Sequence, residues 1–91
     1  MSFFALSTRA QRSLRKLLRS GSFPKQKFQN ALACLQKDEP LPPSFRDHAL
    51  KGKLSEFREF HLTADLLVQY KSNDKRHIVT ISRIGTHAEL F

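Results

Sequence analysis

The sequence predicts an α+β domain in which two N-terminal helices pack on one face of an antiparallel sheet of about four strands. Apolar residues recur at helical spacing up to about residue 37, whereas β-branched and aromatic runs separated by turn residues follow after residue 54. A proline-rich segment stands between these two parts. Because the chain has 91 residues, we expect a single domain over residues 1–91.

The first part of the chain has the periodicity of a helical hairpin. Residues 2–5 are apolar and predict a short edge strand, and residue 7 or 8, a serine or a threonine, suits the N-cap of the helix that follows. Gly21 is typical of a helix C-terminus, and Pro24 is typical of the first turn of a second helix that reaches about Lys37. The positions predicted to face the core are Leu6, Ala10, Leu14, Leu17 and Leu18, then Phe28, Ala31, Leu32 and Leu35.

The second part carries strand and turn signals. The prolines at positions 40, 42 and 43 end any helix and make a stiff connector. Strands are predicted within residues 56–62, 66–70 and 78–84, with Leu66, Val68 and Tyr70 on one side of the second strand. Turns are predicted at residues 61–65 and 72–75. Helices followed by an antiparallel meander give the α+β class.

The positive charge is concentrated at the start of the chain. The protein has 16 Lys and Arg against 8 Asp and Glu, a net charge of +8, and no acidic residue precedes residue 38. Such a basic block indicates a polyanionic partner, which can be nucleic acid, an anionic membrane surface or an acidic protein. The arginines on the polar face of the first predicted helix are Arg9, Arg12, Arg15 and Arg19. A mitochondrial transit peptide over residues 1–22 is an alternative, but its removal would leave too little helix to cover the rest of the chain.

Composition also excludes several classes of protein. The single cysteine, Cys34, excludes an intramolecular disulfide and a cysteine-based zinc finger, and its place on the apolar helix face indicates a buried side chain. No apolar run approaches the ~18–20 residues of a membrane span, so we expect no crossing of a bilayer. The chain has no glycine-rich phosphate loop, and its histidine spacing fits no zinc template. We therefore expect neither a cofactor nor a metal ion.

Groups suited to acid–base chemistry lie in the second half of the chain. All four histidines, at positions 48, 61, 77 and 87, fall there, together with Asp65, Arg83 and the terminal Phe91. Histidine has the unperturbed pKa nearest to pH 7, which suits general acid–base catalysis. Cleavage of RNA needs a base for the 2′-hydroxyl, a cation beside the phosphate and an acid for the leaving oxygen. The 2′-hydroxyl is an internal nucleophile, so this reaction does not require a metal.

Each of these residues also has a simpler interpretation. His77 lies in a polar run and is most simply a loop residue, and His48 can pair with the preceding Asp47. Asp65 can cap a turn, and Arg83 can be a solvated strand residue. Taken singly, none of these side chains establishes a function.

Four ordered blocks of the sequence, taken together, resemble the YafQ-type toxins of the RelE/ParE superfamily. The blocks are Asp47-His48-Ala49-Leu50-Lys51-Gly52, Phe57-Arg58-Glu59-Phe60-His61-Leu62, Asp65-Leu66-Leu67-Val68-Gln69-Tyr70 and Arg83-Ile84-Gly85-Thr86-His87-Ala88-Glu89-Leu90-Phe91. The resemblance covers about residues 39–91, and residues 1–38 agree only in layout. Two positions depart from the family pattern: Leu66 stands where a tryptophan is common, and Lys53 and Leu54 stand where an aromatic residue is common.

This resemblance implies a small microbial-RNase-like fold and the toxin half of a bacterial type II toxin–antitoxin module. The implied activity is endonucleolytic cleavage of mRNA as it is translated in the ribosomal A site, by metal-independent acid–base catalysis. The implied functional residues are His48, His61, Asp65, His87 and Phe91, with Arg83 as the group that grips the scissile phosphate. The basic helix face would then hold ribosomal RNA phosphates.

The resemblance also implies the partners of the chain. These are an acidic cognate antitoxin that folds on binding, mRNA on the ribosome, and operator DNA through the toxin–antitoxin complex only, in the bacterial cytoplasm. Three alternatives remain open. The chain can be a non-catalytic RNA-binding or ribosome-binding protein, a relative that acts on a DNA topology enzyme, or a zinc-binding protein.

Overall fold

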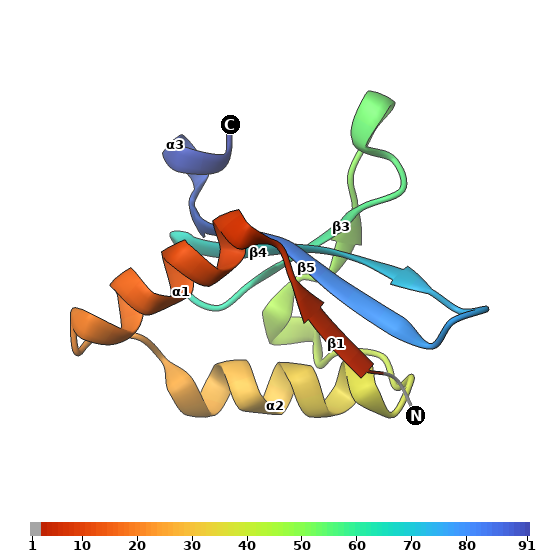
Figure 1. The fold of residues 1–91 in the computed structure, drawn as a ribbon, viewed down its shortest axis with the longest axis horizontal. Coiled ribbons are helices and arrows are strands. Elements are labelled where there is room, and N and C mark those ends of the chain that lie inside the picture. The colour runs from red at the N-terminus through yellow and green to blue at the C-terminus, as the bar shows by residue number, and fades with distance from the viewer. Residues whose placement is uncertain (1–2) are drawn as a thin grey trace.

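The computed structural model describes residues 3–91, which fold as a sheet with helices on both of its faces (Figure 1). Single 3₁₀ turns lie at Pro43–Phe45 and Gly52–Leu54. The helices and strands, in chain order, are β1 (Phe3–Leu6), α1 (Thr8–Arg19), α2 (Lys25–Gln36), β2 (His48–Ala49), β3 (Arg58–His61), β4 (Leu66–Asn73), β5 (Ile78–Thr86) and α3 (His87–Leu90). The predicted α+β class is confirmed.

The sheet is mixed rather than antiparallel. Its five strands have the order β1-β5-β4-β3-β2, and β1 pairs in parallel with β5 while the other pairs are antiparallel. The predicted edge strand therefore exists, but the expected antiparallel sheet of about four strands is corrected to a mixed sheet of five. Composition can indicate a strand, but its direction depends on the partner that the fold brings to it. The fifth strand, β2, is only two residues long and gave no sequence signal.

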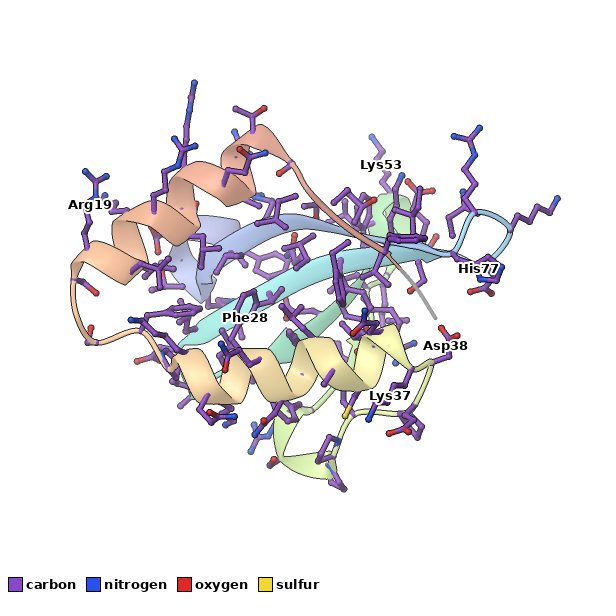
Figure 2. All side chains as sticks on the ribbon, turned by 60° about the horizontal axis from the view of Figure 1, so that its bottom comes forward. Arg19, Phe28, Lys37, Asp38, Lys53 and His77 are labelled. Atoms are coloured by element: carbon purple, nitrogen blue, oxygen red, sulfur yellow. The ribbon has the colours of Figure 1, made fainter. Side chains whose placement is uncertain are left out.

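Both predicted helices form, and they pack on one face of the sheet. Ser7 caps α1: its hydroxyl accepts from the Ala10 N–H at 3.0 Å and donates to the Ser82 carbonyl at 2.6 Å, which ties the helix to β5. Gly21 follows α1 with φ +78°, a conformation that favours glycine. Phe28 of α2, labelled in Figure 2, is buried in the core. Cys34, predicted to be buried, is only half-buried.

The core lies between these helices and the strands. Phe60, Leu62, Val68 and Ile81 are fully buried, and Leu66 and Tyr70 join them from β4. Strand β4 extends beyond the prediction to Asn73, so the turn falls on residues 74–77. Leu67 and Gln69 are also buried, although they point to the opposite face, so β4 is covered on both sides. Within residues 3–91, no helix is long and apolar enough to span a membrane.

Candidate active site

The sheet face opposite α1 and α2 carries a row of polar side chains. His48 on β2 pairs with Glu59 on β3, Glu59 with Gln69 on β4, and Gln69 with Arg83 on β5. Directly paired residues point to the same face of a sheet, so these four side chains form one row across four strands. His61, Leu67 and Gly85 form the next row. In Figure 1, α3 and the segment around residues 50–57 both rise from this face, on the side opposite α2.

The ring of His48 lies between two oxygen atoms. Its Nδ1 lies 2.7 Å from the carbonyl oxygen of Arg46, and its Nε2 lies 3.5 Å from Oε1 of Glu59. Nδ1 must carry a proton to donate to a carbonyl, so in the neutral ring Nε2 has the lone pair. The simpler interpretation, in which His48 pairs with Asp47, is wrong.

Asp47 instead belongs to a network at the edge of the core. It accepts from the Tyr70 hydroxyl at 2.7 Å and from Arg58 Nε at 3.3 Å. Burial, and then the hydrogen bond to Asp47, raise the pKa of the Tyr70 phenol, and the hydrogen bond to Asp47 raises the pKa of Arg58. This network fixes the segment before β2, and thereby the Arg46 carbonyl that orients His48.

Glu59 is a buried carboxylate that the site prediction did not include. It is 4% exposed, and its Oε2 accepts from Gln69 Nε2 at 3.1 Å, which leaves Oε1 directed at His48. An acidic residue between Arg58 and Phe60, in the middle of a predicted strand, was the available signal. A buried carboxylate indicates a built polar site, because burial of a charge without partners is costly.

His61 lies at the end of β3, half-buried, with its ring centroid 6.1 Å from that of His48. A cavity of about 260 Å³ lies beside it, lined by Lys27, Ser44, Arg46, His61, Thr63 and Ala64. Its two cations come from α2 and from the segment before β2, so the sequence did not group them with the histidines. A polar cavity with two positive charges beside an imidazole suits a phosphate group.

The C-terminal residues fold into the short helix α3 over the same face. Thr86 is its N-cap: the Thr86 hydroxyl accepts from the Glu89 N–H at 3.3 Å, while the Glu89 carboxylate accepts from the Thr86 N–H at 2.9 Å. The hydrogen bond from the Thr86 backbone lowers the pKa of Glu89. A Cβ at Gly85 would lie 3.3 Å from Glu89 Oε1, a tight contact from which the capping carboxylate would have to move by a few tenths of an ångström.

This helix places His87 and Phe91 side by side. Their ring centroids are 4.9 Å apart at an interplanar angle of 33°, and both side chains are exposed. Leu90 is buried and anchors the helix on the sheet. An exposed imidazole beside an exposed phenyl ring can contact a bound base and its phosphate together.

The guanidinium of Arg83 was expected to be free to bind the scissile phosphate, but in the structure it is hydrogen-bonded to the backbone of α3. Its Nη1 donates to the Leu90 carbonyl and its Nη2 to the Glu89 carbonyl, both at 3.1 Å. Its Nε is buried and has no hydrogen-bond partner among the described residues. The guanidinium therefore clamps α3 to β5, and each Nη retains one further N–H for another acceptor.

The two histidine groups lie on opposite sides of β4. The pair His48 and His61 belongs to β2 and β3, whereas His87 follows β5. Strands β3 and β5 are both neighbours of β4, so site-facing residues on them are roughly 10 Å apart, twice the ~4.8 Å strand spacing. Asp65 directly precedes Leu66, which pairs with Thr86, so Asp65 lies at the same end of the ladder as His87.

Asp65 lies in the turn before β4, and Leu66 is the first residue of that strand. Asp65 is exposed, and the turn before β4 is closed by the Thr63 hydroxyl, which accepts from the Asp65 and Leu66 N–H groups. The interpretation of Asp65 as the turn cap is therefore wrong. The Leu66 side chain packs in the core, so the departure from tryptophan at this position changes packing rather than the site-facing surface.

The basic residues of α1 border the same region from the edge of the sheet. Arg9, Arg12, Arg15 and Arg19 are all exposed, and Arg19 is labelled in Figure 2. Arg9 and Arg83 line one cavity of about 290 Å³ with Glu89, and Arg12 and Lys16 line a neighbouring one of about 410 Å³. Positive charge thus continues from the candidate site onto α1.

One cluster among residues 3–91 could hold a metal ion. The potential ligand atoms of His48, Glu59 and His61 all lie within 4.8 Å of one another. Sequence spacing did not select this cluster, because its members come from two strands whose pairing brings them together.

Comparison with known proteins agrees with this fold. The sequence model of one family, described as the bacterial toxin of type II toxin-antitoxin system, YafQ, matches residues 4–91. The chain is 40% identical over 52 residues to the mRNA interferase toxin YafQ of Escherichia coli strain K12, a match covering 57% of this chain and 54% of that protein. The chain thus spans about half the length of that curated relative.

Solved structures are similar over the whole chain. A copper-bound variant of a toxin from Helicobacter pylori superposes with a TM-score of 0.92 and 37% identity, covering 100% of both chains. A chain of the E. coli DinJ–YafQ toxin–antitoxin complex superposes with a TM-score of 0.84 and 26% identity, covering 100% of this chain and 99% of that one.

Proposed function

The chain belongs to the YafQ family of bacterial type II toxin–antitoxin toxins, and on this premise we propose that it is an endoribonuclease that cleaves mRNA on the ribosome. One observation carries the proposal: imidazoles lie on both sides of β4, on one open sheet face. Cleavage by the 2′-hydroxyl needs a base on one side of the phosphate and an acid on the other. The relative named mRNA interferase toxin YafQ supports mRNA as the substrate.

We propose that the scissile phosphate lies over Leu67 and Gln69 of β4, between the two histidine groups. One group, His48 with His61, and the other, His87 with Asp65, act as the proton acceptor and the proton donor. Phe91 stacks on a base next to His87, and one free Nη–H of Arg83 reaches the phosphate. Nearby groups of this kind titrate as a set, so the direction of proton transfer has to be assigned by experiment.

Cleavage on this scheme needs no metal ion, because the nucleophile is internal and imidazoles move the protons. The positive charge that stabilises the transition state comes from Arg83 and from Lys27 and Arg46 beside His61. A chelator that binds transition metals but leaves the Mg²⁺ of ribosomes in place should not reduce the rate. Abolition of cleavage by such a chelator would refute this scheme.

The first experiment is primer extension on a translated mRNA with purified ribosomes. New 5′ ends should appear with the wild type and be absent with His87→Ala, while His77→Asn should cleave normally. His77 is the matched control because it lies in the turn at the far end of β4 and β5, at φ 53°, where asparagine is also tolerated. Cleavage by His87→Ala at the wild-type rate would contradict the assignment.

A second substrate assigns the acid and the base. RNA with a bridging 5′-sulfur at the cleaved bond has a better leaving group, which reduces the need for a general acid. A variant that lacks the acid should regain most of its lost rate on this substrate, whereas one that lacks the base should not. We expect His87→Ala on one hand, and His48→Ala or His61→Ala on the other, to respond differently. Equal responses would place them in one role.

We propose that the arginines of α1 hold ribosomal RNA and that an acidic antitoxin segment masks the toxin. The DinJ–YafQ complex supports an antitoxin partner, and operator DNA would be reached only through such a complex, in the bacterial cytoplasm. The logarithm of the ribosome-binding constant should fall linearly with the logarithm of the salt concentration, and removing one phosphate contact should reduce the magnitude of this slope by about one. An unchanged slope in Arg12→Gln would exclude Arg12 from the interface.

A non-catalytic ribosome-binding protein is the second candidate, and the exposed basic face of α1 is the observation that favours it. This alternative predicts that His87→Ala inhibits translation as strongly as the wild type without producing new RNA ends. Loss of inhibition together with loss of cleavage would reject it.

A further inference from the structure

We propose that the cavity beside His61 holds the mRNA phosphate that neighbours the scissile one, on the side of the His48 and His61 group. The ligand is a backbone phosphodiester of the same RNA strand that is cleaved. The identity of this phosphate rests on the proposed function, because it takes the scissile phosphate to lie over β4. The cavity itself is defined by its own residues.

The residues that line the cavity place it to one side of the scissile phosphate. Lys27 comes from α2, Arg46 from the segment before β2 and Thr63 from the turn after β3. None of the described residues that border it belongs to β4 or β5. His61 also borders it and pairs with Leu67, over which we place the scissile phosphate. A phosphate in the cavity is therefore separated from the scissile one by His61.

The charge of this cavity differs from that of its neighbours. Lys27 and Arg46 bring two positive charges, and no carboxylate stands among the described residues that line it. The two cavities beside α1 also have two cations each, but Glu89 lines both of them. The cavity at the far end of β4 combines two lysines with two acidic residues. Two cations without a compensating carboxylate favour the binding of a phosphate.

Lys27 is held in position before any RNA binds. Its Nζ lies 5.3 Å from the centroid of the Phe45 ring, which is buried in the core. This contact keeps the half-buried lysine stem beside the ring. Within residues 3–91, neither Lys27 nor Arg46 forms an ion pair, so both cations can pair with an RNA phosphate.

Thr63 adds a hydrogen-bond donor to the cavity. Its Oγ1 accepts from the N–H groups of Asp65 and Leu66, so its own O–H proton can be donated to a phosphate oxygen. The volume of about 260 Å³ is below the roughly 300–1,000 Å³ of pockets that enclose whole small molecules, which suits a phosphate group rather than a complete nucleotide. Recognition here is therefore of the RNA backbone and not of a base.

Arg46 connects the cavity to His48. It lines the cavity, and its carbonyl oxygen lies 2.7 Å from Nδ1 of His48. Its φ of 50° is a left-handed conformation that is costly for a residue other than glycine, and such strain is typical of functional sites. A phosphate held by Arg46 would steady the segment that orients His48. Occupation of the cavity should therefore raise the rate of the chemical step as well as RNA affinity.

The cleavage arm of the test removes one phosphate charge at a time. Ribosomes carry a synthetic mRNA with an uncharged methylphosphonate at the linkage next to the cut, on its 5′ side or its 3′ side. One of the two should slow the wild type by roughly 10–100-fold, the contribution of one hydrogen bond between charged groups. Lys27→Gln should cleave the unmodified RNA more slowly and should show little further loss with that methylphosphonate. Lys25→Gln, on the same helix but outside the cavity, should behave as the wild type.

The side of the sensitive linkage is also predicted. The 2′-hydroxyl belongs to the nucleotide on the 5′ side of the cut, so a base in the His48 and His61 group requires the 5′ linkage. An acid in that group requires the 3′ linkage, and the bridging-sulfur substrate decides between the two. Sensitivity that depends on Lys27 at the other linkage, at both or at neither overturns the proposal.

The binding arm uses the full-length protein and no RNA. Inorganic phosphate, added at an ionic strength held constant with chloride, should shift the amide resonances of Arg46 and Thr63 saturably. Lys27→Gln should weaken this binding about tenfold or more, and Lys25→Gln should not, with circular dichroism melts to establish folding. Shifts that are absent, or that Lys27→Gln leaves unchanged, overturn the site. If the wild type cleaves no RNA, the proposed function fails, while this arm still decides whether the cavity binds phosphate.

Discussion

Substitution of Arg83 by lysine should release the C-terminal helix without unfolding the domain. Arg83 donates two hydrogen bonds to the helix, one to the Leu90 carbonyl and one to the Glu89 carbonyl, both at 3.1 Å. A four-residue helix is not stable alone in water, so α3 stays in place only through Leu90, its capping box and this clamp. The lysine keeps the positive charge, but its single ammonium cannot reproduce the fork.

The expected change in the docking of α3 follows from the loss of one hydrogen bond between residue 83 and the carbonyls of the helix. Lysine has three N–H donors but lacks the planar fork that spans both carbonyls, so we expect the loss of one of the two hydrogen bonds, and a hydrogen bond to a charged group contributes about 1.5–3 kcal/mol. A loss of about 2 kcal/mol lowers the ratio of docked to released α3 by roughly 30-fold. Leu90 and the capping box remain, so β4 and β5 should keep their stability.

Amide hydrogen exchange of the free protein measures this directly. The Phe91 N–H donates to the His87 carbonyl at 2.9 Å only while α3 is formed. Its exchange in Arg83→Lys should be 10–100 times faster than in the wild type, with the amides of β5 unchanged. Because no RNA is present, loss of a phosphate contact cannot produce this result. Equal exchange in the two proteins would refute the clamp and return Arg83 to a role in RNA binding alone.

Three further changes test other parts of the structure. Tyr70→Phe removes the donor to Asp47 and should lower the free energy of unfolding in urea by about 1–2 kcal/mol; an unchanged midpoint would show that the network contributes nothing. The lowered pKa of Glu89 means that its stabilisation of α3 is complete above the ordinary carboxyl pKa and is lost as pH falls through the lowered value. Amide shifts of α3 in an acid titration should follow this loss, and Glu89→Gln should remove the pH dependence. Lys27→Gln should weaken RNA binding with a salt slope smaller by about one unit, whereas an unchanged slope would exclude a phosphate in the cavity beside His61.

Local patterns were sufficient for much of the architecture. The helical spacing of apolar residues, Ser7 as a cap and Gly21 as a terminator are properties of short segments, and the structure has the cap and the terminator where they were predicted. Among the predicted core positions of α1, Leu18 is wrong, because its side chain is exposed. Strands β3, β4 and β5 were also predicted from local signals, β-branched runs and turn residues, although β4 extends to Asn73 and shifts the turn to residues 74–77. The concentration of positive charge on α1 needed only the sequence and the helical period.

Pairing between distant segments was decided by the tertiary structure alone. The parallel direction of β1, the short strand β2 and the position of Glu59 between His48 and Gln69 all depend on register, which the composition of a strand does not specify. His48 and Asp47 illustrate the same limit: they are neighbours in the chain, but Asp47 accepts from the Tyr70 hydroxyl of β4 whereas His48 lies against Glu59 of β3. The sequence indicated candidate residues for the chemistry, and the fold determines which of their atoms lie together, because hydrogen bonds form only between groups that the packed strands bring within about 3 Å.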